Sequence, residues 1–166
     1  MNEPYDCTAE VKEHISLVQF WAAHFGRILA DRALVHDASK LNNPVEKQMF
    51  DTWTPELKTR EAGTPEYQEA LAQMGVGLQM HYQANSHHPE HYKDGVDGMN
   101  LYDVVEMVCD WMAVCEKKGV PVDMGYLQTR FKISPQLRAI IENTFMEVDV
   151  ETIKGGLPRG PFLKGK

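Results

Sequence analysis

The sequence predicts an all-α protein. Apolar residues recur every three to four positions along most of the chain, which is the spacing of one helix face. The breaks between these runs contain Pro, Gly and Asn, and no long run alternates apolar and polar residues as a half-buried strand does. With 166 residues, 43% of them hydrophobic, the chain is expected to form a single-domain helical bundle over residues 1–150, followed by an irregular tail over residues 151–166.

The first half of the chain is expected to contain four helices. Thr8 begins the first, with Glu10 in the first turn, where an acid suits the helix dipole. Gly26 is expected to bend or break the run, and Pro44 suits the first position of a new helix. Gly75 and Gly77 lie inside the fourth pattern and indicate close packing or a bend. The expected helices cover residues 8–25, 27–41, 44–53 and about 65–83.

A polar loop over residues 85–92 divides this half from the next. Strong helical spacing returns over residues 99–116, and the Gly-Val-Pro that begins at Gly119 ends it. Two shorter patterns, over residues 126–131 and 135–148, predict the last helices.

Composition narrows the classes of function. The net charge of −7 argues against a large nucleic-acid footprint, although a bound metal would still allow a small phosphorylated ligand. Three cysteines without a CxxC pair are typical of reduced thiols, no run is long enough to cross a membrane, and the N-terminus lacks a signal-peptide pattern. We therefore expect a cytoplasmic protein with no membrane partner; homo-oligomerisation stays open.

The most informative stretch is Ala-Leu-Val-His-Asp-Ala-Ser-Lys-Leu, residues 33–41. His36 and Asp37 stand among apolar neighbours, where both side chains need a polar partner. A divalent metal satisfies both, because imidazole nitrogen and carboxylate oxygen are common ligands for Zn, Mn and Fe. The alternative is a His-Asp pair that hydrogen-bonds its neighbours.

Further potential ligands come from other elements: His14, His81, His87, His88 and Asp110. Facing helices of a bundle build metal sites in this way. Each residue also has a plainer interpretation: His14 as a hydrogen-bonded core histidine, His81 as a helix-end residue, and the pair His87-His88 as exposed. Asp110, between Cys109 and Trp111, is the hardest to explain without a ligand role, because Asp is rarely buried unpaired.

The order His14, His36-Asp37, Asp110 resembles the His…His-Asp…Asp signature of the HD-domain superfamily of helical, metal-dependent phosphohydrolases. Lys40 and the pair His87-His88 are similar to elements of its cyclic-dinucleotide phosphodiesterase branch. The Gly-Tyr-Pro element of that branch is absent, so a cyclic-dinucleotide substrate is not supported.

The chain is also similar, over about residues 8–148, to an uncharacterised family frequent in phage and bacterial genomes. The shared motifs are His-Asp-x-Ser-Lys-Leu, Asn-x-His-His-Pro-Glu-His and Gly-Met-Asn-Leu with Glu-Met-x-x-Asp-Trp. That family carries no assigned substrate.

The resemblance to the HD superfamily implies a bundle of the HD type and hydrolysis of a phosphoester or phosphoanhydride in a small nucleotide-like or phosphodiester substrate. One ion, of Mn, Fe, Zn, Co or Mg, would be held by the set His14, His36, Asp37 and Asp110, and a second by the set His81, His87 and His88, with Asp37 bridging. The metal would lower the pKa of bound water towards ~7.

Other side chains are expected to act on the substrate. Lys40, with Asp37, is expected to be catalytic by meeting the phosphate charge, and Arg130 is an outer phosphate contact. Glu46 or Glu90 would protonate the leaving oxygen. The alternatives are a di-iron oxygenase of the same superfamily and a non-enzymatic module that binds metal or nucleotide.

Overall fold

The structure is a computed structural model that describes the backbone of residues 5–154 and the side chains of residues 5–149. Within these ranges the chain is helical, with no strand, as the sequence predicts. The chain divides into two compact units, residues 1–36 and residues 37–166. The single-domain organisation over residues 1–150 stays a prediction.

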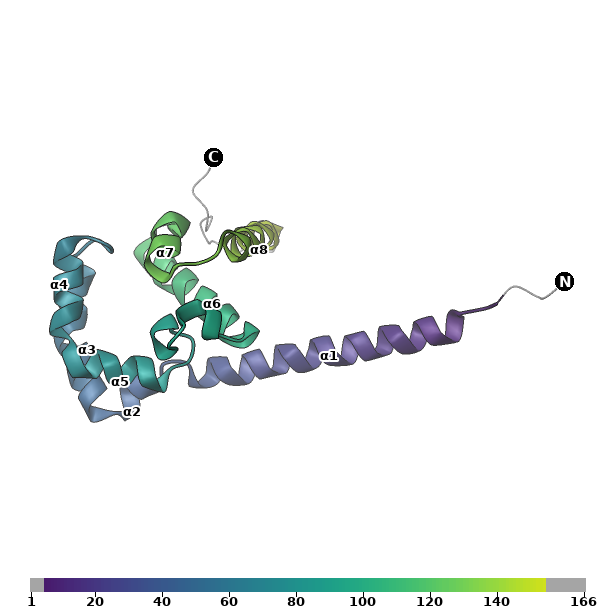
Figure 1. Cartoon of the computed structure of the whole chain (residues 1–166), viewed down its shortest axis with the longest axis horizontal. Coiled ribbons are helices and arrows are strands. Elements are labelled where there is room, and N and C mark those ends of the chain that lie inside the picture. Colours follow the sequence, from purple (N-terminus) through teal and green to yellow (C-terminus); the bar gives the residue numbers. More distant parts are fainter. Residues whose placement is uncertain (1–4, 155–166) are drawn as a thin grey trace. The chain divides into compact units, whose positions relative to one another are not determined.

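The first unit is built on one long helix, α1, Thr8–Val35 (Figure 1). It begins at the predicted residue, with Glu10 in its first turn and the Asp6 side chain accepting hydrogen bonds from Thr8. The expected interruption at Gly26 does not occur, because one glycine inside a helix of 28 residues costs only about 1 kcal/mol. Residues 8–25 and 27–35 are therefore a single element.

The second unit begins with short and closely packed helices: α2, Ser39–Asn42, and α3, Pro44–Lys58. Pro44 occupies the first turn of α3, as predicted, and the Asn43 side chain caps the helix by accepting from the backbone N–H groups of Val45 and Glu46. Helix α3 continues through Pro55 and ends at Lys58, five residues beyond its predicted end at residue 53.

The predicted fourth helix is two helices, α4, Pro65–Gln73, and α5, Gly75–Ala84. The break lies at Gly75, whose φ of +53° is in the left-handed region that glycine adopts most easily. Gly77 serves close packing instead, since a Cβ there would lie 2.7 Å from the Met49 sulfur on α3. The sequence predicted close packing or a bend at these two glycines. The bend lies at Gly75, and the close packing at Gly77.

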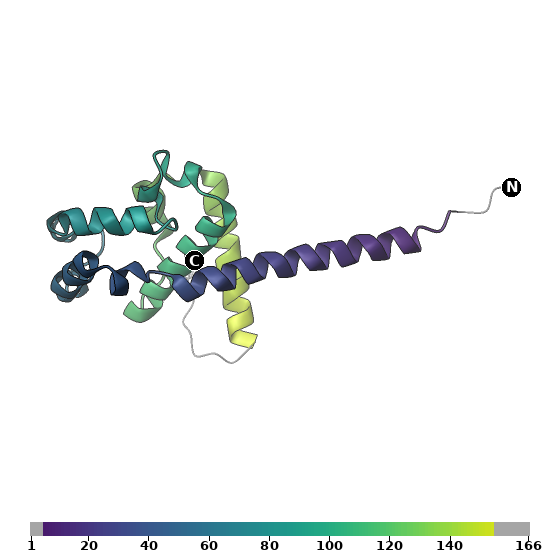
Figure 2. The same ribbon diagram turned by 90° about the horizontal axis from the view of Figure 1, so that it is seen from below.

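The second half of this unit carries the larger core. Two 3-10 turns, η1 (Pro89–His91) and η2 (Gly95–Gly98), lead into α6, Leu101–Lys118, and Gly119 ends α6 with a φ of +66°. Helices α7, Met124–Phe131, and α8, Pro135–Lys154, follow, and Figure 2 shows the length of α8. The buried core residues are Val96, Met107, Val108, Val122, Met124, Leu127, Ile133, Ile141 and Phe145.

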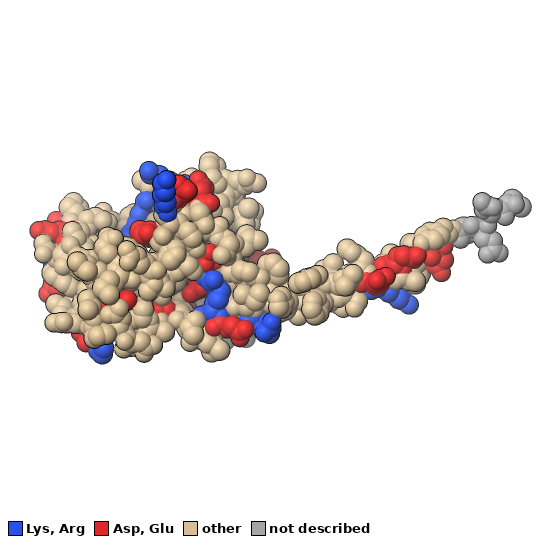
Figure 3. Space-filling model, turned by 60° about the horizontal axis from the view of Figure 1, so that its bottom comes forward, with Lys and Arg blue, Asp and Glu red and all other residues tan. Residues whose placement is uncertain are grey.

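The irregular tail expected over residues 151–166 does not begin at residue 151. Residues 151–154 are the last residues of α8, and residues 155–166 lie outside the described residues. No described helix is both long and apolar enough to cross a membrane. Figure 3 shows the charged side chains on one face, with residues 14–26 of α1 contributing none.

Candidate metal centre

Asp37 is the first residue of the second unit and has a φ of +55°. Asp tolerates the left-handed region better than most residues, and such strained positions cluster at functional sites. The turn at Asp37 leads into α2, where the Lys40 N–H donates to the Asp37 carbonyl at 2.9 Å. The Lys40 ammonium also forms an ion pair with the Asp37 carboxylate and lies 4.6 Å from the centre of the Phe50 ring.

His81 on α5 is held by a buried carboxylate. Its Nδ1 lies 3.2 Å from Oε2 of Glu46, a residue with no exposed surface. Ser39 donates to the same carboxylate oxygen at 2.7 Å, and Asn85 donates to the Ser39 hydroxyl at 2.8 Å. With Nδ1 engaged in this way, Nε2 of His81 lies 3.5 Å from Oδ1 of Asp37.

His87, in the loop after α5, lies between a carboxylate and Asp37 in the same way as His81 does. Its Nδ1 lies 3.1 Å from Oε1 of Glu106 on α6, and its Nε2 lies 3.5 Å from the same Oδ1 of Asp37. Two imidazoles thus direct Nε2 at one carboxylate oxygen, and each has Nδ1 against a carboxylate. Carboxylate contacts of this kind fix the tautomer and orientation of metal-binding histidines.

The loop that carries these histidines is anchored by Asp103. This residue has no exposed surface and accepts hydrogen bonds from the Ser86 and Tyr92 hydroxyls, both at 2.7 Å. It also accepts from the Asn100 backbone N–H, completing the capping box of α6. Asp103 lies in the first turn of α6, and it fixes Ser86, the residue directly before His87.

His88 completes the group. Its Nε2 lies 2.8 Å from Nε2 of His81, and its ring centre lies 4.2 Å from that of His87. Single ligand atoms of Asp37, His81 and His88 all lie within 4.8 Å of one another. We call Asp37, His81, His87 and His88 the histidine–aspartate cluster.

The donor set fits a divalent transition metal. Ligand atoms about 2.0–2.2 Å from one ion lie about 3.0–3.5 Å from each other, which is close to the spacings of 2.8 and 3.5 Å in the cluster. Oε1 of Glu46 is buried and has no hydrogen-bond partner among the described residues, so this carboxylate has an acceptor site left over next to His81. Imidazole with carboxylate suits Zn, Mn, Fe or Co.

Burial favours the neutral, metal-binding form of two imidazoles in the cluster, those of His81 and His88. Burial lowers the pKa of His88 to about 3, and the neighbouring His87 and His81 rings act in the same direction. Burial and the Lys40 charge lower the pKa of His81, against the opposing effect of Asp37 and Glu46. Metal ligation requires neutral histidine, so little proton release would accompany binding near pH 7.

The other predicted metal ligands are His14, His36 and Asp110. His14 lies in the first turns of α1 and His36 is the cap residue after its last turn, about 33 Å away at 1.5 Å per residue, so α1 does not bring them together around one ion. His36 caps the C-terminus of α1 and directly precedes Asp37 in the chain. Asp110 is half-buried on α6, and its charge raises the pKa of His88 against the effect of burial. The ligand roles of all these residues stay predictions.

Two carboxylates, Glu46 and Glu106, contact histidines of the cluster, and the sequence predicted that role for neither. Glu46, expected as a proton donor, is enclosed and contacts His81 and Ser39, so it positions a histidine instead. Its spacing from Met49 and Phe50 placed it on an apolar helix face, which signals a buried carboxylate. Glu106 shares a face of α6 with Asp103 and Asp110, and that spacing could have identified it.

Comparison with known proteins gives one match. Residues 3–147 match the model of a family of unknown function, DUF5662. No curated protein and no solved structure matches the chain. Since the match covers most of the sequence, the chain belongs to the DUF5662 family.

Proposed function

We propose that the protein is a metal-dependent phosphohydrolase that acts on a small phosphorylated substrate, with a fold of the HD type. The observation that carries the proposal is the convergence of His81 and His87 on one oxygen of Asp37, each ring with Nδ1 against a buried or half-buried carboxylate. Carboxylates that hold both Nδ1 atoms and direct both Nε2 atoms at one oxygen are the arrangement in which histidines serve as metal ligands.

A divalent ion at the cluster would act as a Lewis acid and lower the pKa of water towards ~7. The chain itself supplies the positive charge beside it. Lys40 pairs with Asp37, and its side chain keeps 32% of its surface exposed, so its ammonium can contact a phosphate oxygen from solvent. His81 and His87 are held by Glu46 and Glu106 and hold their orientation without substrate. Fixed donors and charges of this kind stabilise developing negative charge.

The substrate reaches the cluster from the side of Asp37, His88 and Lys40. Asp37 keeps 18% of its side-chain surface exposed, while His81 and His87 keep 2% each. Both histidines are therefore closed off from solvent on the side away from Asp37. The sparse, unbridged cysteines favour a cytoplasmic setting for this activity.

The test is turnover by the purified protein loaded separately with Mn, Co, Zn, Fe or Mg. The panel contains a phosphomonoester, a phosphodiester and nucleoside mono-, di- and triphosphates. We expect turnover with at least one metal and a loss of at least ~100-fold in Asp37→Asn, because that variant removes the central carboxylate. His24→Gln, on α1, is the matched control and should keep full activity.

Bound metal without turnover of any substrate would contradict the proposal. Oxygen consumption by the iron-loaded protein in air, with no hydrolysis, would support the di-iron oxygenase instead. A metal without an exchangeable water would favour the non-enzymatic module, because structural sites are closed.

A further inference from the structure

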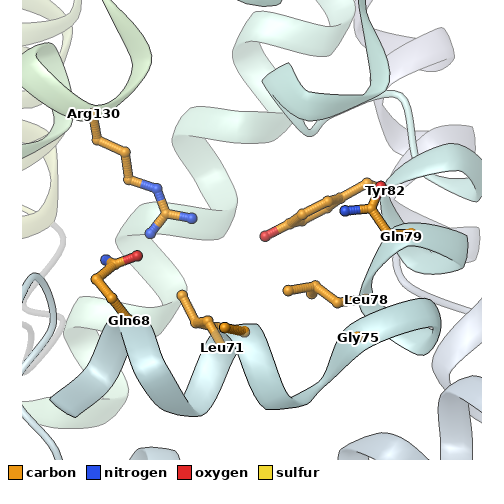
Figure 4. A pocket seen from close by; sticks show the side chains of 8 residues that line it. Gln68, Leu71, Gly75, Leu78, Gln79, Tyr82 and Arg130 are labelled. Atoms are coloured by element: carbon orange, nitrogen blue, oxygen red, sulfur yellow. The ribbon is translucent and has the colours of Figure 1, made fainter. Parts of the chain in front are cut away.

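A cavity of about 300 Å³ lies between α4, α5 and α7, next to the histidine–aspartate cluster. Figure 4 shows its lining side chains, with the Arg130 guanidinium on one side and the Tyr82 ring on the other. The lining residues are Gln68, Leu71, Ala72, Gly75, Leu78, Gln79, Tyr82 and Arg130. Its lining combines apolar side chains with polar groups that converge on it, an arrangement that fixes the orientation of a small polar ligand.

Arg130 gives this cavity a permanent positive charge. Its guanidinium donates to the Tyr126 hydroxyl at 3.0 Å and to Oε1 of Glu90 at 3.3 Å. The side chain is 26% exposed, so it is partly desolvated and still accessible from the cavity. A guanidinium has five donors in a planar fork that matches phosphate or carboxylate, and the contacts of Arg130 with Tyr126, Glu90 and Tyr82 do not exhaust them.

Tyr82 connects the cavity to the cluster. It follows His81 directly in α5, and its ring centre lies 5.1 Å from that of His88. Its hydroxyl points across the cavity towards Arg130 (Figure 4). Burial raises the pKa of Tyr82 to about 12, with the Glu90 charge acting in the same direction, so the hydroxyl is a neutral hydrogen-bond donor near pH 7.

We propose that this cavity is an oxyanion subsite, in which Arg130 and Tyr82 bind a phosphate-class group of the substrate other than the one that reacts. The assignment of a reacting group at the cluster rests on the proposed function, whereas the anion site rests on the cavity alone. The Tyr82 ring lies beside His88 of the cluster, and the Tyr82 hydroxyl points into the cavity. A molecule that reached both the cluster and the cavity would therefore present one anionic group to each.

Glu90 acts as the competitor for Arg130. Its carboxylate occupies a guanidinium donor at 3.3 Å and is 32% exposed, so an incoming anion can displace it into solvent. Removing the Glu90 charge should therefore strengthen anion binding, while removing the Arg130 charge should weaken it. Opposite signs at two neighbouring residues distinguish a built anion site from a general effect on folding.

The experiment is calorimetric titration of phenyl phosphate, with inorganic phosphate in parallel, into metal-free protein kept in a chelator. We expect Kd to rise at least tenfold in Arg130→Gln and threefold or more in Tyr82→Phe, and to fall threefold or more in Glu90→Gln. Arg138→Gln is the matched control, because Arg138 is also half-buried and pairs with Glu142 at 2.8 Å. Circular dichroism of each variant confirms that it is folded.

Equal binding by wild type, Arg130→Gln and Glu90→Gln would overturn the proposal, as would the absence of phenyl phosphate binding to the wild type. Because no metal and no turnover enter the measurement, the subsite and the hydrolase proposal fail separately. Arg130-dependent binding without hydrolysis under any metal would leave the subsite standing and remove the reaction.

Discussion

The buried carboxylate of Glu46 contacts Nδ1 of His81 at 3.2 Å, and the opposite nitrogen of that ring faces Asp37. This contact links a buried residue of α3 to the centre of the candidate site. It sets which nitrogen of His81 is available to a metal, and it does so through a residue that no substrate can reach.

Replacing Glu46 by Gln should weaken metal binding without unfolding the protein. Gln keeps the size of the side chain and loses the charge that orients His81, and comparable changes behind metal-binding histidines cost 10–100-fold in affinity. Competition against a chromophoric chelator measures the change. Glu56→Gln, at an exposed position on α3, should leave the affinity unaltered; similar affinities for both variants would show that Glu46 does not position His81.

Replacing Asp103 should lower the free energy of unfolding more than replacing most other polar residues. Asp103→Ala removes the acceptor of the Ser86 and Tyr92 hydroxyls and of the Asn100 N–H, with an expected loss of about 3 kcal/mol in unfolding free energy. Urea denaturation gives this value. Asp97→Ala, at an exposed position in η2, provides the comparison, and equal losses at both positions would refute the anchoring role.

The metal-free protein should lose stability as the pH falls below about 6.5. Burial lowers the pKa of His88 to about 3 and also lowers that of His81, so between these values the unfolded chain binds protons that the folded chain does not. The unfolding free energy therefore rises with pH across this window. Urea midpoints of wild type and His88→Gln between pH 4 and pH 7.5 test this, and the variant should show the weaker dependence; an identical dependence would exclude His88 as a contributor.

The close approach of α3 and α5 at Gly77 predicts coupling between residues 77 and 49 in a double-mutant cycle. A Cβ at residue 77 would lie 2.7 Å from the Met49 sulfur, so Gly77→Ala should destabilise the wild type by about 1–3 kcal/mol. A Met49→Ala background removes the sulfur and Cγ contacts and leaves only the Met49 Cβ, 2.9 Å from the added carbon, so the same change should cost clearly less there. Additive effects in thermal or urea unfolding would contradict the contact.

Part of this arrangement could be read from the sequence. Asp37 and His81 stood out as polar residues within apolar helical runs, and His87-His88 as paired ligand types in a polar loop; the structure places all four together. The division of α4 from α5 was not predicted as such, because both glycines weaken a helix equally in sequence and only the fold decides that Gly75 turns while Gly77 packs.

The orienting carboxylates were harder to predict. Glu46 and Glu106 lie on helices far in sequence from the rings they contact, and helical periodicity gives the face of a residue but not the element opposite. The pairing of His14 with His36 relied on a helix break at Gly26, and one glycine is too weak a signal to decide that break.

The most direct test of the metal centre is a crystal structure of the manganese-loaded protein with anomalous diffraction recorded at the Mn edge. The account predicts an anomalous peak about 2.0–2.3 Å from Oδ1 of Asp37 and from Nε2 of both His81 and His88. A map without a peak among these three side chains, from crystals whose protein binds manganese elsewhere or not at all, would contradict it.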